Sequence, residues 1–136
     1  MNFQIDVLSL TGKLYSGEAE KVTIPSLTGE MTVLARHMPV VAPLVTGEVI
    51  VKTPKETLNL SIGKGVFEFS EGRARLLIED VASADEISEE RALEAKKRAE
   101  ELLAKGIGEE AKHQIMYQLR KSLIDLKIAR KRKKNL

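Results

Sequence analysis

The chain has 136 residues, 43% of them hydrophobic, which is enough for one domain or for one small domain with an appendage. It has no apolar run near the roughly 18 to 20 residues of a membrane-spanning helix, so we expect a soluble protein or one attached to a membrane through partners. Cysteine is absent, which excludes a disulfide framework, a thiol nucleophile and a cysteine zinc site, and no N-terminal signal for secretion is recognisable.

Charge is unevenly distributed along the chain. Residues 1–84 carry 8 basic and 10 acidic side chains, and residues 85–110 carry 5 basic and 9 acidic ones. Residues 111–136 carry 9 basic side chains against the single Asp125. A segment of net charge +8 therefore follows one of net charge −4, and the function has to account for this basic tail.

The first 84 residues alternate between apolar and polar with a period of two. The pattern begins at Phe3, Ile5 and Val7 and recurs over residues 21–24, 48–51 and 57–62. Glycine- and proline-containing turn signals separate these runs at short intervals, among them Gly63-Lys64-Gly65, which we interpret as a hairpin turn. Many short strands with frequent turns predict an N-terminal β-sandwich of about ten strands over residues 1–84.

The stretch from residue 25 to residue 47 is the densest in turn signals. Gly29 and Gly47 suit tight turns, because glycine tolerates a positive φ. Pro25, Pro39 and Pro43 lack a backbone N–H, so we expect them at edges, bulges and corners of the sheet.

The period changes at Asp85, where a helical pattern starts. Ser88 is a suitable N-cap and Lys105-Gly106 a suitable end for a first helix, whose apolar stripe consists of Ala92, Ala95, Ala99 and Leu102. After the link Gly106-Ile107-Gly108, a second helix has a stripe of Ile115, Leu119, Ser122, Leu126 and Ala129. Residues 85–136 thus predict an antiparallel two-helix hairpin, and the whole chain an α+β fold.

The seam of this hairpin is rich in alanine, which limits its apolar area. With about 25 cal/mol per Å² of buried apolar surface, we expect the folded and the extended hairpin to differ by only a few kcal/mol. A partner can then select between the two forms.

The sequence contains no recognisable enzyme motif. Its two histidines, His37 and His113, are far apart, and neither a zinc-protease motif nor a phosphate-binding glycine loop is present. The adjacent carboxylates Glu79-Asp80 and Glu89-Glu90 suit solvated surfaces better than acid–base catalysis. We therefore expect no catalytic residues and no metal site.

The central stretch closely resembles the ε subunit of F-type ATP synthases. The likeness rests on Pro25, Gly29-Glu30, Val33-Leu34, His37, Pro39, Leu44 and Gly47, and it extends to residues 63–68 and to the charged hairpin. It implies a non-catalytic rotor subunit whose sandwich binds the γ subunit and the ring of c subunits. It also implies a hairpin that inhibits ATP hydrolysis, and a peripheral location on the cytoplasmic face of the cell membrane.

The resemblance also implies roles for single residues. Glu30 and His37 stand where the family has its rotor-contacting glutamate and histidine, so they are expected, with Met31 and Arg36, to contact γ or the c ring. The simpler alternative is that Glu30 is a solvated turn residue and His37 a packed loop residue. In the extended hairpin, the basic second helix would enter the catalytic head of α and β subunits and meet an acidic segment of β, through Arg120, Lys121, Lys127 and Arg130.

Some members of the family bind ATP in the folded hairpin through an Ile/Leu-Asp-x-x-Arg-Ala motif. The corresponding residues here are Ile87, Ser88, Arg91 and Ala92, so the aspartate has become serine. Lys121 and Asp125 stand where the second helix would supply arginines, and an aspartate repels phosphate. We therefore expect no cofactor, with regulatory ATP at these residues as the weaker alternative.

A second hypothesis from another class is a nucleic-acid-binding protein that uses residues 130–134 as a basic arm. The acidic first helix and an aromatic content of only 4% argue against it. The simplest hypothesis is a β-sandwich scaffold with an incidental helical tail, which would have no effect on any ATPase.

Overall fold

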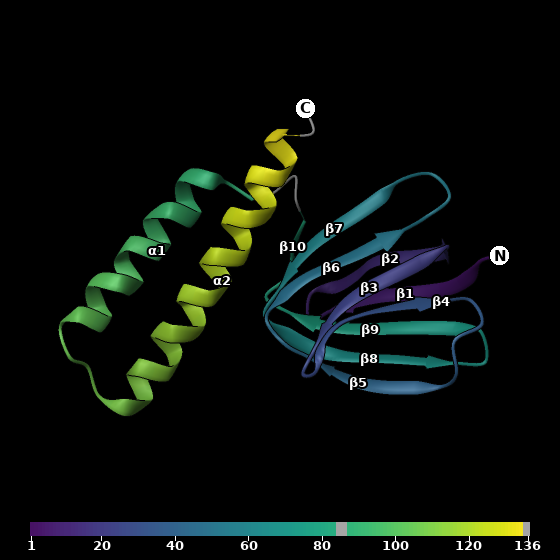
Figure 1. Cartoon of the computed structure of the whole chain (residues 1–136), viewed down its shortest axis with the longest axis horizontal. Helices are drawn as coiled ribbons and strands as arrows, with labels where there is room; N and C mark the ends of the chain where they lie inside the picture. Colours follow the sequence, from purple (N-terminus) through teal and green to yellow (C-terminus); the bar gives the residue numbers. More distant parts are fainter. Residues whose placement is uncertain (84–86, 135–136) are drawn as a thin grey trace. The chain divides into compact units, whose positions relative to one another are not determined.

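The computed structural model describes residues 1–83 and 87–134, with side chains described up to Lys131 (Figure 1). The chain divides into two compact units, Met1–Ser83 and Ala84–Leu136. The predicted boundary between residues 84 and 85 lies outside the described residues. No described helix is both long enough and apolar enough to cross a membrane.

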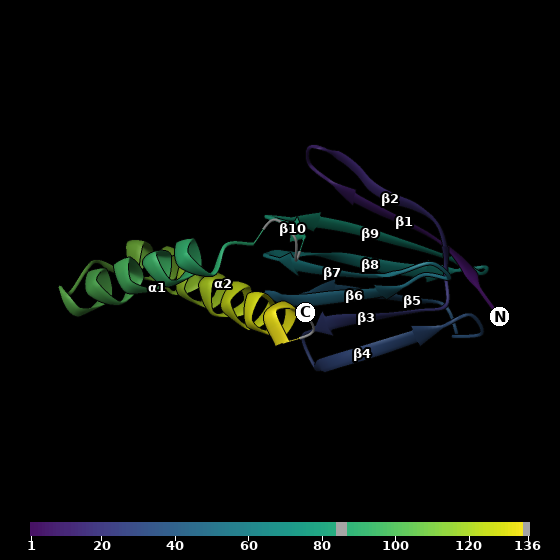
Figure 2. The same ribbon diagram turned by 90° about the horizontal axis from the view of Figure 1, so that it is seen from above.

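The first unit consists of ten β-strands, as predicted, in one curled sheet. Their bounds are β1 Phe3–Ser9, β2 Gly12–Ala19, β3 Lys21–Ser26, β4 Gly29–Leu34, β5 Val40–Leu44, β6 Gly47–Lys52, β7 Thr57–Ile62, β8 Lys64–Ser70, β9 Arg73–Glu79 and β10 Ala82–Ser83. The strand order is β10-β7-β6-β3-β5-β8-β9-β1-β2, with β4 paired to β3. Figure 2 shows β2 and β4 on opposite sides of this β-sandwich.

The core lies between the two halves of the curled sheet. The inward residues of the alternating runs fill it, as the period of two predicts: Phe3, Ile5, Val7, Val22, Ile24, Val49 and Val51 are all buried. Strands β8 and β9, which lie in the same half as β1, add Phe67, Phe69, Leu76 and Ile78. Burial of these side chains on both halves is what holds the sandwich closed.

The corner predicted at Pro25 is where β3 changes its neighbour. Residues 21–23 of β3 pair with β6, whereas Ser26 pairs with Leu44 of β5. The carbonyl oxygen of Pro25 accepts a hydrogen bond from the Val45 N–H at 2.9 Å. Proline fits this position because the strand needs no donor there.

Gly29 has the expected positive φ of 122°, but Gly47 does not adopt a positive φ. It is the first residue of β6 instead, and a Cβ at Gly47 would lie 2.7 Å from the Pro25 Cβ atom. Close packing against the Pro25 ring, rather than a turn, therefore requires glycine at this position. Pro43 likewise lies within a strand, β5, opposite Val66 of β8.

The hairpin predicted at Gly63-Lys64-Gly65 is wrong. Strand β7 pairs with β6 and β10, whereas β8 pairs with β5 and β9, so this link crosses from one half of the sheet to the other. Gly65 is the second residue of β8 rather than a turn residue. Its lack of a side chain serves close packing, since a Cβ there would lie 2.2 Å from the carbonyl oxygen of Leu77.

The second unit contains two helices, α1 Glu89–Ala104 and α2 Glu109–Lys134. Ser88 caps α1 as predicted, and its hydroxyl accepts a hydrogen bond from the Arg91 N–H at 3.3 Å. Helix α1 ends at Ala104, with Lys105 as its C-cap and Gly106 at a φ of 72°. This is the glycine-terminated helix end that the sequence indicated.

The predicted seam is largely confirmed, because Ala92, Ala99, Ser122, Leu126 and Ala129 are all buried. Leu102, however, is 39% exposed, and Leu103 is half-buried in its place. With 3.6 residues per turn, Leu103 lies about 20° from Ala92 around the helix axis, whereas Leu102 lies roughly 80° away. The seam therefore continues through Leu103.

Candidate interaction surfaces

The turn between β3 and β4 presents Glu30 to solvent. Glu30 is the second residue of β4, opposite Pro25, and its side chain is exposed. The turn is braced by the Ser26 hydroxyl, which donates to the Gly29 carbonyl oxygen at 2.5 Å. Leu27 at the tip is 72% exposed. A braced turn with an exposed carboxylate and an exposed apolar side chain is a suitable contact point for a partner.

Met31 follows Glu30 but faces the other way. Successive side chains of a strand alternate between its two faces, and Met31 packs against the hydrophobic core in a half-buried position. Its packing therefore holds β4 against the core on the face opposite Glu30.

Arg36 and His37 lie just after the end of β4. The His37 N–H donates to the Leu34 carbonyl oxygen at 3.0 Å, and the His37 Nδ1–H donates to the Met38 carbonyl oxygen at 2.7 Å. The imidazole packs edge-on against the Phe69 ring, with the centroids 6.3 Å apart. The exposed Arg36 places its Nε 3.3 Å from the Met1 sulfur. His37 is thus a partly packed loop residue held in a fixed orientation.

The structure does not bring Glu30 and His37 together. Glu30 is near the start of β4 and His37 follows its end. At about 3.3 Å per strand residue, roughly 13 Å separates Glu30 from Leu34, and His37 lies beyond Leu34. The predicted site is therefore two separate contact points at the two ends of β4.

An apolar row on the outer face of the sheet was not predicted from the sequence. Direct cross-strand neighbours on β5, β8, β9 and β1 form it: Pro43, Val66, Leu77 and Leu8. Val66 is 43% and Leu77 49% exposed, Pro43 is exposed and Leu8 half-buried. Neighbouring strands lie about 4.8 Å apart, so the row extends over roughly 14 Å. We call these four residues the outer row.

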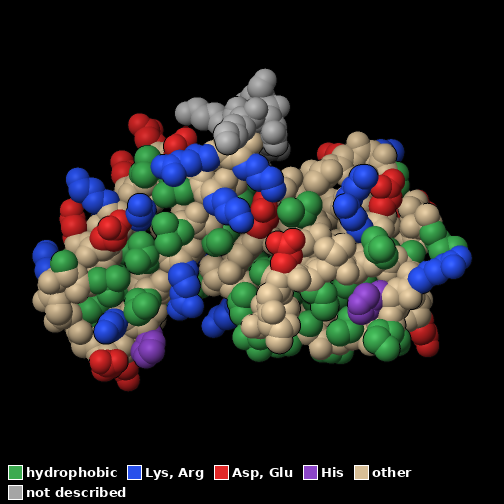
Figure 3. All heavy atoms as spheres, viewed as in Figure 1, with side chains coloured by type: hydrophobic (Ala, Val, Ile, Leu, Met, Phe, Trp, Pro, Cys, Tyr) green, Lys and Arg blue, Asp and Glu red, His purple; other side chains and the backbone are tan. Residues whose placement is uncertain are grey.

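Charged side chains border the outer row on both sides. One flank consists of Glu68, Arg75 and Asp6 in consecutive register, and the other of Lys64 opposite Glu79. An apolar centre with a charged rim is the anatomy of protein interfaces. In Figure 3, hydrophobic side chains gather along the lower edge of the strand unit, where β5 runs in Figure 1.

The solvent-facing side of α2 is basic. Arg120, Lys127 and Arg130 are all exposed, and steps of three and four residues align them with Lys112, Met116 and Leu123, which are also exposed. We call these six residues the basic stripe. Lys121 is not part of it: its side chain is only 16% exposed and forms an ion pair with Asp125 at 3.1 Å.

Most of the residues that match the ATP motif already have a structural role within the hairpin. Ile87 and Ala92 are buried, Ser88 caps α1, and Arg91 is exposed. On α2, the position expected to supply an arginine holds Asp125 in its pair with Lys121. These side chains offer a phosphate group one exposed cation, Arg91, and a carboxylate, so the arrangement suits nucleotide poorly.

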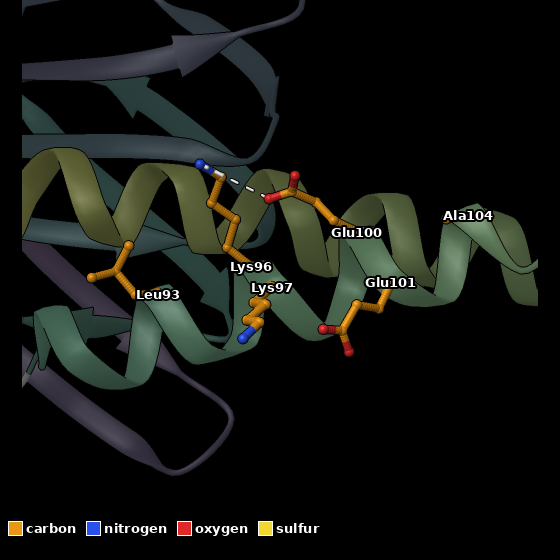
Figure 4. A pocket seen from close by; sticks show the side chains of 6 residues that line it. All are labelled: Leu93, Lys96, Lys97, Glu100, Glu101 and Ala104. Carbon is orange, nitrogen blue, oxygen red and sulfur yellow. Dashed lines mark ion pairs between the residues drawn. The ribbon is translucent and has the colours of Figure 1, made fainter.

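A shallow hollow follows one side of α1 (Figure 4). Its lining is Leu93, Lys96, Lys97, Glu100, Glu101 and Ala104. Lys96 and Glu100 face each other at 3.9 Å. Both charge signs are present in equal number, so the hollow offers no selective site for an anion or a cation. Within residues 1–83 and 87–134, no three potential metal ligands come together.

Comparison with known proteins decides the family. The family described as "ATP synthase, Delta/Epsilon chain, beta-sandwich domain" matches residues 2–84. The chain belongs to this ATP synthase delta/epsilon family. The resemblance seen in the central stretch of the sequence is therefore confirmed.

Relatives extend the match into the hairpin. The chain is 39% identical to "ATP synthase epsilon chain 1" of Methylococcus capsulatus over 105 residues, which cover 76% of this chain and 75% of the relative. It is 32% identical to an ATP synthase epsilon chain of Dehalococcoides mccartyi over 133 residues, 97% of this chain and 95% of the relative.

Among solved structures, the fold is similar to a chain of the Euglena gracilis mitochondrial ATP synthase (OSCP/F1/c-ring). The TM-score is 0.79 at 20% identity, and the match covers 88% of this chain and 76% of that one. This likeness supports the delta/epsilon fold.

Proposed function

We propose that this delta/epsilon family member is a non-catalytic subunit of the central stalk, or rotor, of a rotary ATP synthase. Its sandwich attaches to the γ subunit and the c ring, which couples ion transport to ATP synthesis. Its hairpin extends to inhibit ATP hydrolysis by the α and β subunits. As part of that complex it is a peripheral protein on the cytoplasmic face of the cell membrane.

The observation that carries the attachment is the outer row with its charged rim. An exposed apolar row of this kind gains free energy when a partner excludes water from it. We assign the γ subunit to the outer row. We assign the exposed Glu30 and Leu27, with Met31 on the opposite face of β4, to a contact with the c ring. Arg36 and His37 provide a second contact at the other end of β4.

The observation that supports inhibition is the basic stripe on α2. Cationic side chains alternate along it with two apolar ones, Met116 and Leu123, which are 42% and 44% exposed. An acidic segment of the β subunit is the complementary partner, because opposite charges steer the encounter and apolar contacts hold it. Arg120 and Lys127 are exposed for this contact, whereas Lys121 would first have to leave Asp125 and Arg130 would have to leave Glu89.

The test of inhibition is ATP hydrolysis by an α, β and γ complex reconstituted with either the full chain or a chain ending at Ala84. The sandwich has a hydrophobic core of its own, so the shortened chain is expected to bind. Faster hydrolysis with the shortened chain supports the proposal. Equal rates with both chains bound would contradict inhibition, and failure of both to bind would contradict the attachment.

The test of the outer row is binding of γ by Leu77→Asp. Leu10→Asp is the matched control, because Leu10 is 87% exposed and lies in the turn between β1 and β2, outside the row. We expect Leu77→Asp to weaken γ binding at least tenfold while Leu10→Asp does not. Equal affinities of the two variants would assign γ to another surface.

A further inference from the structure

An ion pair between Glu89 and Arg130 joins the two helices of the hairpin. The Nε of Arg130, near the end of α2, lies 3.3 Å from an Oε1 of Glu89, the first residue of α1. The Glu89 side chain is 29% exposed and that of Arg130 62%. The two residues are 41 positions apart in the chain, so this contact exists only while the hairpin is folded.

The pair lies at the end of the hairpin where opening separates the two helices most. The link at residues 105–108 joins the helices at one end of the hairpin, and Glu89 and Arg130 lie at the other. When an antiparallel hairpin opens about its link, this remote end separates most. The seam between the helices includes the small buried residues Ala92, Ala99, Ser122 and Ala129, whose apolar area is limited. A single pair can therefore shift the balance between the folded and the open hairpin.

Arg130 also belongs to the basic stripe that we assign to the acidic partner. While the hairpin is folded, the Arg130 Nε–H that bonds to Glu89 is not available to a carboxylate of the β subunit. The Glu89 carboxylate also offsets part of the positive charge that would attract an acidic partner.

We propose that Glu89 is an intramolecular competitor for Arg130: it latches the folded hairpin, and an acidic partner must displace it to stabilise the extended form. This inference deepens the proposed inhibitory function and rests on it for the identity of the partner. The latch itself is a property of the chain alone and does not depend on a partner. Because the pair is partly exposed, salt weakens it.

The latch is tested on the full chain. The sequence has no cysteine, so Glu94→Cys and Leu123→Cys allow two spin labels to be placed on the exposed surfaces of α1 and α2. Pulsed electron paramagnetic resonance then gives the ratio of open to folded hairpin. We expect Glu89→Gln to raise this ratio by about 1.4- to 5-fold, the range for a partly exposed ion pair.

Glu90→Gln is the matched control. Glu90 is the second residue of α1, so its loss costs the same favourable interaction with the helix dipole, but it is exposed and Arg130 pairs with Glu89. Exchange of the charges, Glu89→Arg with Arg130→Glu, should restore a lower open fraction than either substitution alone. High salt should raise the open fraction of the original chain more than that of Glu89→Gln.

Equal open fractions for Glu89→Gln and Glu90→Gln would overturn the latch, because only the helix dipole would then matter. Failure of the charge exchange to restore folding would overturn it as well. A second readout separates the two proposals. If Glu89→Gln opens the hairpin but ATP hydrolysis by the reconstituted complex does not fall, the latch stands and the inhibitory function fails.

Discussion

Replacement of Gly65 by alanine should destabilise the sandwich far more than the size of one added methyl group suggests. Gly65 lies in β8 between Leu44 of β5 and Ile78 of β9. Its φ is not in the left-handed region, so alanine can adopt its backbone conformation. The obstacle is space, because the added Cβ would lie 2.2 Å from the Leu77 carbonyl oxygen and 3.0 Å from the Ile78 Cα.

The atoms in the way belong to a backbone that is held on both sides. Strand β9 pairs with β8 and with β1, so Leu77 cannot move without disturbing two ladders. Overpacking of this kind costs about 1 to 3 kcal/mol, and backbone contacts place Gly65→Ala near the upper value. For a unit of 83 residues, about 3 kcal/mol corresponds to a fall in Tm of roughly 12 to 24 °C.

Scanning calorimetry of the full chain measures this fall, with Gly17→Ala as the control. Gly17 is also a strand glycine, but its added Cβ would meet the end of the Tyr15 side chain, 2.9 Å from the hydroxyl, and that side chain can rotate away. We expect Gly17→Ala to cost about 1 kcal/mol, including the Tyr15 hydrogen bond to the Glu18 carbonyl oxygen. A loss of stability in Gly65→Ala no larger than in Gly17→Ala would refute the steric argument.

Three further predictions follow from the packing and the helix ends. Phe69→Ala should cost about 3 to 5 kcal/mol in urea unfolding, because Phe69 is 2% exposed and packs on Phe3 at a centroid distance of 5.6 Å; an unchanged midpoint would contradict this. Ser88→Ala should cost about 0.5 to 2 kcal/mol of local stability, seen as faster hydrogen exchange in the first turn of α1; exchange as slow as in the original chain would show that the cap is dispensable. Millimolar ATP should leave the Tm unchanged, because Asp125 repels phosphate, whereas ATP at 100 times its Kd would stabilise the chain by about 2.7 kcal/mol.

Much of the local structure could be predicted from the sequence, because it depends on neighbours in the chain. The alternation of Phe3, Ile5 and Val7 with polar residues identifies a half-buried strand, since side chains of a strand point to opposite faces in turn. Ser88 and Gly106 mark the helix ends because one supplies an acceptor for a free N–H and the other tolerates a positive φ. The resemblance of residues 25–47 to the family is also visible in the sequence alone.

Only the tertiary structure decided which distant segments meet. The link at Gly63-Lys64-Gly65 has the composition of a hairpin turn, but burial of β7 and β8 in different halves of the sheet makes it a crossing. The parallel pairing of β1 with β9 joins residues about 70 positions apart, and it aligns Leu8 with Leu77. The sequence alone does not give this register, so it does not reveal the outer row.

The same limit applies to charge. The sequence reveals a basic second helix, yet it does not tell which cations are already paired. Lys121 forms an ion pair with Asp125 one turn away, and Arg130 forms one with Glu89 at the end of the hairpin remote from the link. Arg120 and Lys127, by contrast, face solvent. The sequence by itself determined the alternating strands, the ends of the first helix and the family. Register and helix rotation, which depend on the burial of all elements at once, decided which side chains remain exposed for partners.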